Sequence, residues 1–170
     1  MKKKITVIGN GALSLSIATQ MGSRGGEIVY VDVRDGILPQ TSPIVHVIGK
    51  QEYHIHFNEI TNSYLSVSEA DIVIIAVTPS FHAQVFANIL PLIKDGQLVV
   101  FFPACFGAIN FLAALQDQEI DITTCEAVAF PSVCEMQSQD TLYIQNIKSS
   151  MRVAVKPKEK TEETLALLNS

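Results

Sequence analysis

The chain has 170 residues, of which 48% are hydrophobic and 17% charged, and its net charge is −5. This length predicts one domain, and the composition excludes a disordered chain. The largest basic cluster, Lys2-Lys3-Lys4, is too small to indicate a nucleic-acid partner, and the apolar runs are too short to span a membrane. The mean hydropathy of +0.28 favours a sheet that is buried on both faces, or a domain with an exposed interface.

Two features indicate a cytoplasmic protein. The basic start is followed by an apolar stretch that glycines interrupt, which argues against a signal peptide. The three cysteines, Cys105, Cys125 and Cys134, are odd in number and lack the spacing of a metal site. Reduced thiols in the cytoplasm are the simplest interpretation of this pattern.

The first part of the chain predicts a β-α-β unit of about 30 residues. Residues 5–8 are a β-branched run, which predicts a buried strand. Residues 11–21 carry apolar side chains at helical spacing, and Gly25-Gly26 ends that helix. Residues 28–31 predict a second apolar strand, which stops at Asp32.

The next segment does not continue this pattern. Residues 44–57 alternate apolar and polar side chains around Gly49-Lys50, which predicts an inserted β-hairpin. His54 and His56 fall on one face of its second strand. Two imidazoles could bind a metal, but no third ligand is evident, so we expect a solvated strand face and no metal site.

The remaining residues alternate strands with helices. Strands are predicted at residues 72–77, 98–102, 122–130, 142–144 and 152–155, a short helical turn or loop at 66–71, and helices at 80–90, 107–116 and 158–169. Pro79 fits the first position of a helix, and Leu165 and Leu168 are expected to face inward in the last one. The alternation predicts an α/β fold: a doubly wound, mostly parallel sheet of the Rossmann type, with the hairpin as a small insertion.

A glycine turn joins the first strand to the first helix. Residues 9–14 read G-x-G-x-x-S, where the first glycine allows a sharp turn and the second lets the backbone approach a pyrophosphate. The helix behind the turn directs free N–H groups and its positive end at the phosphates. Ser14 departs from the usual Gly or Ala but is small enough to serve. The candidate phosphate-binding residues are Gly9, Asn10, Gly11, Ala12 and Leu13.

Asp32 ends the second strand about 20 residues after Gly11, which is the separation expected of a ribose-binding acid. A carboxylate there accepts hydrogen bonds from the ribose hydroxyls and repels a 2′-phosphate, so the sequence favours NAD over NADP. Arg34 leaves NADP open, because an arginine just beyond the strand could pair with that phosphate.

Further candidates lie where later strands end, because ligands of doubly wound sheets bind beyond the carboxyl ends of the strands. Val77, Thr78 and Pro79 follow one such strand, His82 lies close by, and Pro103 follows the next. We place all five in the cofactor groove. His82 lacks an evident orienting partner for a catalytic base, and Cys105 lacks a base that would make it a nucleophile.

In this order, four segments resemble the N-terminal NAD(P)-binding domain of the octopine/nopaline (opine) dehydrogenase family. They are residues 5–18 (ITVIGNGALSLSIA), 68–112 (SEADIVIIAVTPSFHAQVFANILPLIKDGQLVVFFPACFGAINFL), 125–136 (CEAVAFPSVCEM) and 147–169 (IKSSMRVAVKPKEKTEETLALLN). Members of that family condense an amino acid with a 2-oxo acid and reduce the imine with a hydride from NAD(P)H. The resemblance implies that Gly9, Asn10, Gly11 and Asp32 hold the cofactor and that Thr78, Pro79 and Pro103 line its nicotinamide side.

In that family a second, helical domain supplies the catalytic histidine and its acidic partner. The resemblance therefore implies that residues 1–170 are a single dinucleotide-binding domain, without the substrate domain and without a catalytic residue. We expect such a chain to bind a dinucleotide and to be inactive alone. The amino acid and the 2-oxo acid are then partners of the parent protein, and a homodimer is among the assemblies left open.

Three alternatives remain beside this interpretation. The chain also looks like the cofactor domain of a ketopantoate reductase or a glycerol 3-phosphate type reductase. A stand-alone NAD-binding regulatory module is the second alternative, and it predicts a surface without a large bare apolar patch. A methyltransferase that uses the glycine turn for a nucleoside is disfavoured by residues 76–82 (AVTPSFH) and by the family resemblance.

Overall fold

A computed structural model of the chain describes residues 2–34, 42–47, 51–115 and 118–169. Its main sheet has seven strands in the order β11-β8-β7-β6-β1-β2-β5. All neighbours in it are parallel except β11 and β8, which confirms the doubly wound, mostly parallel sheet. The strands are β1 (Lys4–Gly9), β2 (Glu27–Asp32), β5 (Glu59–Thr61), β6 (Ile72–Ala76), β7 (Leu98–Phe101), β8 (Thr123–Ala127) and β11 (Val153–Lys156).

The strand order reverses at β1, with β2 on one side and β6 on the other. In the register of these strands, Gly9 lies opposite both Asp32 and Ala76. The glycine turn, the acid of β2 and the residues after β6 therefore meet at one edge of the sheet. This switch in strand order is where doubly wound sheets bind their ligands.

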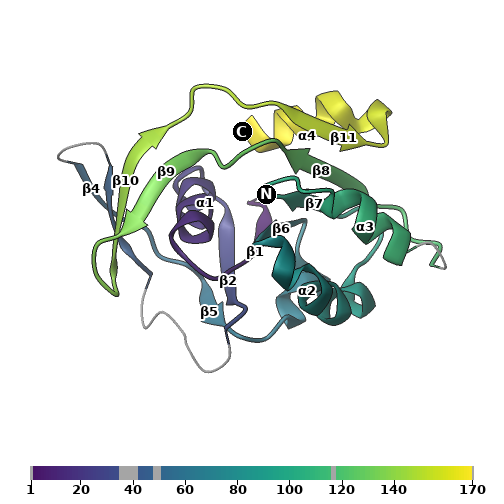
Figure 1. The fold of residues 1–170 in the computed structure, drawn as a ribbon, viewed down its shortest axis with the longest axis horizontal. Coiled ribbons are helices and arrows are strands. Elements are labelled where there is room, and N and C mark those ends of the chain that lie inside the picture. Colours follow the sequence, from purple (N-terminus) through teal and green to yellow (C-terminus); the bar gives the residue numbers. More distant parts are fainter. Residues whose placement is uncertain (1, 35–41, 48–50, 116–117, 170) are drawn as a thin grey trace.

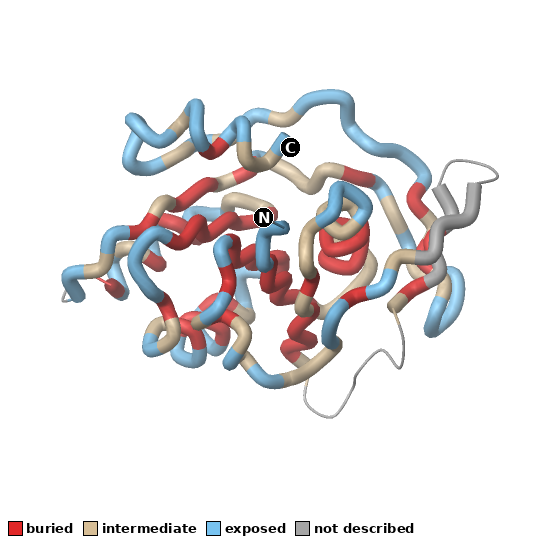
Figure 2. Tube along the Cα trace, turned by 180° about the vertical axis from the view of Figure 1, so that it is seen from behind, coloured by how far each residue is buried: buried red, intermediate tan, exposed pale blue. Residues whose placement is uncertain are grey.

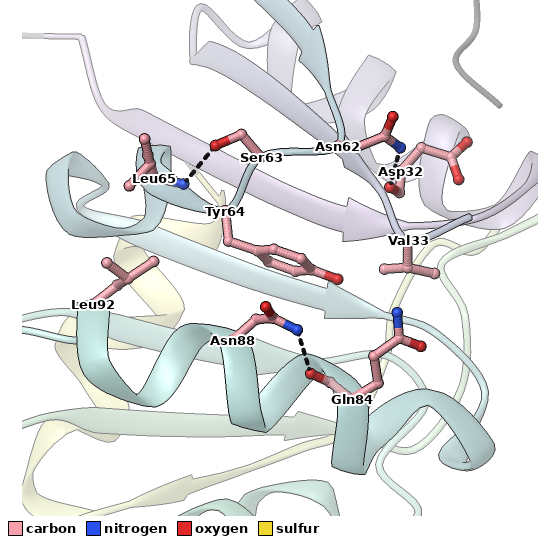
Figure 3. A pocket seen from close by; sticks show the side chains of 9 residues that line it. All are labelled: Asp32, Val33, Asn62, Ser63, Tyr64, Leu65, Gln84, Asn88 and Leu92. Atoms are coloured by element: carbon pink, nitrogen blue, oxygen red, sulfur yellow. Dashed lines mark hydrogen bonds between the residues drawn. The ribbon is translucent and has the colours of Figure 1, made fainter. Parts of the chain in front are cut away.

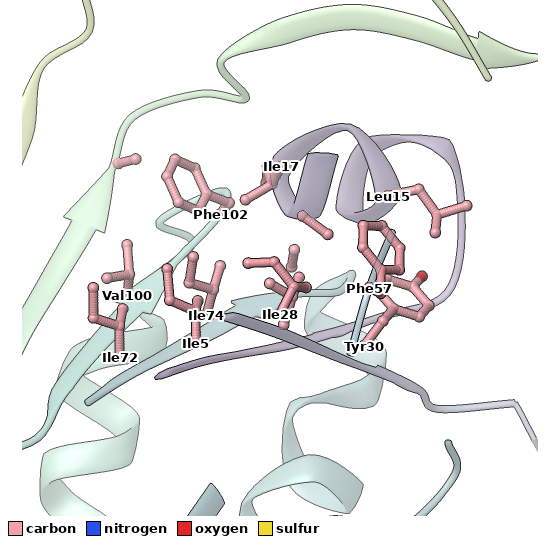
Figure 4. Packing of buried hydrophobic residues seen from close by; sticks show 14 of the residues in the cluster. Ile5, Leu15, Ile17, Ile28, Tyr30, Phe57, Ile72, Ile74, Val100 and Phe102 are labelled. Atoms are coloured by element: carbon pink, nitrogen blue, oxygen red, sulfur yellow. The ribbon is translucent and has the colours of Figure 1, made fainter. Parts of the chain in front are cut away.

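Helices cover both faces of the sheet (Figure 1). The helix α1 (Ala12–Ser23) lies on one face, and α2 (His82–Ile89) and α3 (Gly107–Ala114) lie on the other. Alternate side chains of β1, β2, β6 and β7 pack into two separate cores, so Val7 packs beneath α1 while Ile8 packs toward α2. Figure 4 shows the core beneath α1. Short 3-10 turns η1 (Leu65–Glu69), η2 (Pro79–Phe81), η3 (Leu90–Leu92) and η4 (Lys158–Lys160) and the helix α4 (Thr161–Asn169) complete these connections.

The predicted hairpin is confirmed as β3 (Ile44–Val47) paired antiparallel to β4 (Gln51–His54). It belongs to a larger unit than predicted: a second sheet in the order β4-β3-β10-β9 includes β9 (Ser132–Met136) and β10 (Thr141–Ile147). The strands predicted at 142–144 and 152–155 consequently lie in different sheets. The chain leaves the main sheet after β8 and returns to its edge as β11.

The second sheet covers the outer side of α1, so this helix lies between two sheets (Figure 1). The hydroxyls of Ser16 in α1 and Ser132 in β9 join across this contact at 2.6 Å. Residues 14–19 are all buried, whereas α2 buries only one face. In Figure 2 the inner strands of the main sheet and α1 are mainly buried, while α4 is mainly exposed. There the expectation for Leu165 is wrong: it is exposed, and Leu167 and Leu168 pack on the core.

Candidate dinucleotide-binding site

The first glycine of the turn is required by packing. A Cβ at Gly9 would overlap the Cβ and Oγ of Ser14 and lie 3.2 Å from the carbonyl oxygen of Ala76. Its backbone is not left-handed, so the close approach of α1 to β1, more than the turn itself, demands glycine here.

The second glycine has no such requirement from the protein. The backbone at Gly11 is extended, with φ 179°, and a Cβ there would have no described atom within 4 Å. Neither conformation nor packing explains the glycine, and the space beside it is open. This fits a group that approaches the backbone from outside, as a pyrophosphate does at this position of a Rossmann motif.

Ser14, the departure from the usual motif, holds the turn together. Its hydroxyl donates to the carbonyl oxygen of Gly11 at 2.8 Å and accepts from the N–H of Gly11 at 3.2 Å. Because that single proton is used, the phenol of Tyr30, 2.7 Å away, must donate to Ser14. Tyr30 is completely buried, and burial raises the pKa of its phenol far above the ordinary value.

The N-terminus of α1 presents free donors at this edge of the sheet. Within the described part of the chain, the N–H groups of Ala12 and Leu13 have no hydrogen-bond acceptor. They also lie at the positive end of the helix, beside the half-buried Asn10. Together with the open space at Gly11, they form an arrangement that can bind an anion.

Asp32 lies at the expected place but is already paired. Its Oδ1 accepts hydrogen bonds from the backbone N–H of Arg34 at 2.9 Å and from Nε of Arg34 at 3.0 Å, and its Oδ2 accepts from Nη2 at 2.6 Å. The Asp32 side chain is 0% exposed and that of Arg34 is 40% exposed. Asn62 donates from Nδ2 to the carbonyl oxygens of both residues, at 2.8 and 2.9 Å.

A pocket of about 490 Å³ adjoins this end of β2 (Figure 3). The ring of Tyr64 extends across it toward Val33 and Gln84. The sequence did not indicate this pocket because the lining residues 62–65 follow β5, a strand that is too short and polar to be predicted. Gln84 and Asn88 carried a usable signal, since both lie on the exposed face of the predicted helix after Pro79. The lining residues are Asp32, Val33, Asn62, Ser63, Tyr64, Leu65, Gln84, Asn88 and Leu92.

The candidates after β6 and β7 differ in exposure. Val77 is buried, Thr78 and Pro79 are exposed, and Pro103 is half-buried. Thr78 Oγ1 lies 2.8 Å from the Oγ of Ser80, and Pro79 begins η2 as predicted. All four reach the same edge of the sheet as the glycine turn.

His82 faces the core beneath this edge. It is 7% exposed, its ring stacks on that of Phe86 with 5.4 Å between the ring centroids, and it meets the ring of Phe101 edge to face with 6.3 Å between the centroids. Burial lowers its pKa, which favours the neutral imidazole, although Glu126 opposes this effect. Its contact with a cofactor therefore stays a prediction, and little of its surface is open for one.

The loop after β7 presents apolar side chains beside this edge. Cys105 and Phe106 have positive φ values of 44° and 60°, and Phe106 is 71% exposed. Ile109 and Val128 are also exposed. The loop after β7 adjoins the end of β8, because the N–H of Ala104 donates to the carbonyl oxygen of Ala127 at 2.8 Å.

Within the described residues, no group of three or more His, Cys, Asp or Glu could hold a metal ion. His56 is exposed, and the side chain of His54 lies outside the described part of the structure. No helix in the described ranges is both long and apolar enough to cross a membrane.

Comparison with known proteins finds that the chain is similar to dehydrogenases. No protein-family model matches the chain. An opine dehydrogenase from Arthrobacter sp. (strain 1C) is 30% identical over 108 residues, which are 62% of this chain and 30% of that protein. The chain therefore spans less than a third of that relative.

Solved structures match over nearly the whole chain. An octopine dehydrogenase, solved with NADH and pyruvate, aligns with 99% of this chain and 48% of its own, with a TM-score of 0.84 and 19% identity. A ketopantoate reductase from Ralstonia eutropha JMP134 aligns with 98% of this chain and 53% of its own, with a TM-score of 0.70 and 13% identity. The structures confirm the Rossmann-type fold, and with the sequence match they confirm the resemblance to a nucleotide-binding domain of the opine dehydrogenases.

Proposed function

We propose that residues 1–170 form the NAD(H)-binding domain of an opine-type dehydrogenase. The observation that carries the proposal is the second glycine of the turn. Nothing in the described protein requires glycine at Gly11, yet the open space beside it lies next to the free N–H groups of α1. A bound pyrophosphate explains both features.

The proposed site assigns each part of the cofactor to residues that meet at one edge of the sheet. The N–H groups of Ala12 and Leu13 bind the pyrophosphate, Asp32 binds the adenosine ribose, and the pocket beside α2 receives the adenine. Thr78, Pro79 and Pro103 line the nicotinamide side. When bound, the cofactor supplies the hydride that reduces a carbon–nitrogen double bond. The role of these side chains is to hold and orient it.

The substrates of the parent protein are proposed from the relatives. Octopine dehydrogenase structures were solved with pyruvate, L-arginine or agmatine beside NADH, which supports an amino acid and a 2-oxo acid as partners. Reduction of their imine also needs a proton donor. Among the residues placed in the proposed site, none is a suitable donor, because His82 is buried and favours its neutral form.

We propose that a second domain supplies this donor and that the chain alone does not turn over. Two observations support the proposal. The octopine dehydrogenase that matches is about twice as long, since the match covers 48% of it. Phe106, Ile109 and Val128 expose apolar surface beside the proposed nicotinamide side, where a second domain would cover them. The free cysteines suit a cytoplasmic parent protein.

Titration of NADH and NADPH into the chain by isothermal calorimetry tests the cofactor assignment. We expect NADH to bind and the Asp32→Ala variant to bind it more weakly. The absence of binding by either nucleotide at millimolar concentration would overturn the assignment. For the alternative of a ketopantoate reductase domain, the full-length parent protein should reduce ketopantoate without an added amino acid.

A further inference from the structure

We propose that Arg34 competes with the adenosine ribose for Asp32, so that a dinucleotide binds there only when a ribose with two free hydroxyls replaces the guanidinium group. This inference rests on the proposed cofactor function. It assigns to Arg34 an effect on the affinity for NADH that does not depend on contact with a 2′-phosphate.

The geometry leaves no face of the Asp32 carboxylate open while Arg34 is in place. The guanidinium group reaches both oxygens, at 3.0 and 2.6 Å, and the carboxylate side chain is 0% exposed. A ribose that binds Asp32 must therefore displace the guanidinium group first. The backbone N–H of Arg34, 2.9 Å from Oδ1, can stay where it is.

Separation of the ion pair is less costly for Arg34, which can be hydrated, than for Asp32, which loses hydrogen bonds. The Arg34 side chain is already 40% exposed, so its guanidinium group can move into water. Asp32 would keep only the backbone N–H of Arg34, and a carboxylate that loses its cation and two of its three hydrogen bonds is left in an unfavourable state. Only a ligand that brings its own donors to Asp32 can complete the exchange.

The two dinucleotides differ in those donors. The adenosine ribose of NAD(H) has 2′- and 3′-hydroxyls, which can replace the two guanidinium hydrogen bonds. In NADP(H) a phosphate stands at the 2′ position, so one donor is missing and negative charge lies beside the carboxylate. If Arg34 paired with that phosphate, Asp32 would be left buried without its cation. NAD(H) can therefore complete the exchange with Arg34, whereas NADP(H) cannot, and the discrimination itself lies with Asp32.

Asn62 holds the backbone of Asp32 and Arg34, so that only the arginine side chain has to move when the ribose binds. Its amide holds the carbonyl oxygens of both Asp32 and Arg34, at 2.8 and 2.9 Å. The backbone that positions the carboxylate is thereby held by the residue that follows β5, so Asp32 keeps its place when the guanidinium group leaves.

Four proteins distinguish this role from a phosphate-binding arginine: wild type, Arg34→Ala, Asp32→Ala and the double variant. Kd values for NADH and NADPH are measured by calorimetry on the 170-residue chain, and thermal melts check that each variant is folded. We expect Arg34→Ala to bind NADH about tenfold more tightly, because no guanidinium group has to leave, with no gain for NADPH. Asp32→Ala should reverse the preference toward NADPH, and the double variant should lose the preference.

Two controls accompany these variants. Arg34→Met keeps most of the side-chain length without the charge, and it should behave as Arg34→Ala does. Arg152→Ala removes an exposed arginine elsewhere on the surface and should leave both Kd values unchanged.

The contrary results are distinct from one another. If Arg34→Ala weakens NADPH binding and leaves NADH binding unchanged, Arg34 is a phosphate ligand and the inference is wrong. If wild type binds NADH and Arg34→Ala binds it no more tightly, the inference fails while the proposed function stands. If neither nucleotide binds to any of the four proteins, the proposed function fails and the inference fails with it.

Discussion

The two glycines of the turn predict different effects of the same substitution: alanine at Gly9 should affect stability, and alanine at Gly11 should affect cofactor binding. In Gly9→Ala, the new Cβ overlaps the side chain of Ser14 and approaches the carbonyl oxygen of Ala76. The first turn of α1 must then move away from β1, which also strains the hydrogen bonds of Ser14 to Gly11 and Tyr30. Overpacking costs about 1–3 kcal/mol and each weakened hydrogen bond about 1 kcal/mol.

We therefore expect Gly9→Ala to lower the free energy of unfolding by about 3 kcal/mol, which is about 6–12 °C in Tm for a chain of this size. Thermal melts followed by circular dichroism measure it. The matched control is Gly11→Ala, whose Cβ meets no described atom within 4 Å. We expect the Tm of Gly11→Ala to change by no more than about 2–4 °C, which corresponds to about 1 kcal/mol, while its affinity for NADH falls.

A second substitution separates the clash from a general effect of alanine. Ser14→Gly removes the side chain that the Cβ of Gly9→Ala would meet, so we expect the double variant to be less destabilised than the two single changes added together. If the effects are additive, or if Gly11→Ala is as destabilising as Gly9→Ala, the close approach of α1 to β1 does not explain the first glycine.

Three other regions give separate predictions. Asn62→Ala removes two hydrogen bonds to the carbonyl oxygens at the end of β2, so the free energy of unfolding should fall by about 1–3 kcal/mol in urea titrations. Burial raises the pKa of Tyr30, so the folded chain keeps a proton that the unfolded chain loses near pH 10; stability is then complete below about pH 10 and falls above it by about 1.4 kcal/mol per pH unit. Urea titrations across this range should show a shallower fall for Tyr30→Phe, and an equal slope would contradict the burial of the phenol. Cys105 is exposed, whereas Cys125 is buried and its pKa is raised to about 11, so a thiol reagent should modify Cys105 rapidly and Cys125 only after unfolding. Equal rates would place β8 nearer the surface than the structure does.

The sequence alone was sufficient for the inner strands β1, β2, β6, β7 and β8 of the main sheet and for the position of the glycine turn, but it did not indicate the edge strand β5. Continuous β-branched runs such as residues 72–75 are buried on both faces, and a parallel sheet covered by helices is the arrangement that buries them. The separation of Gly11 from Asp32 also placed the acid correctly, because parallel strands end at one edge and Asp32 lies opposite Gly9.

The second sheet could not be predicted in the same way. Its strand β10 pairs with β3, nearly a hundred residues earlier, and no local pattern specifies such a pairing. The pairing of Arg34 with Asp32 depends on the backbone just after a strand, which residue spacing does not determine. His82 is different, because its spacing to Val85, Phe86 and Ile89 is that of a buried helix face and already indicated a place in the core.

The enclosure of α1 between two sheets has a consequence for how a ligand would be received. A helix covered on both sides can expose its amides to solvent only when one sheet detaches, so the amides of residues 16–19 should exchange hydrogen more slowly than those of α2 or α3. The N-terminal end of such a helix, where we propose that the pyrophosphate binds, is ordered before any ligand arrives. Little conformational entropy then remains to be lost on binding, and the affinity of the turn is determined by the contacts it makes.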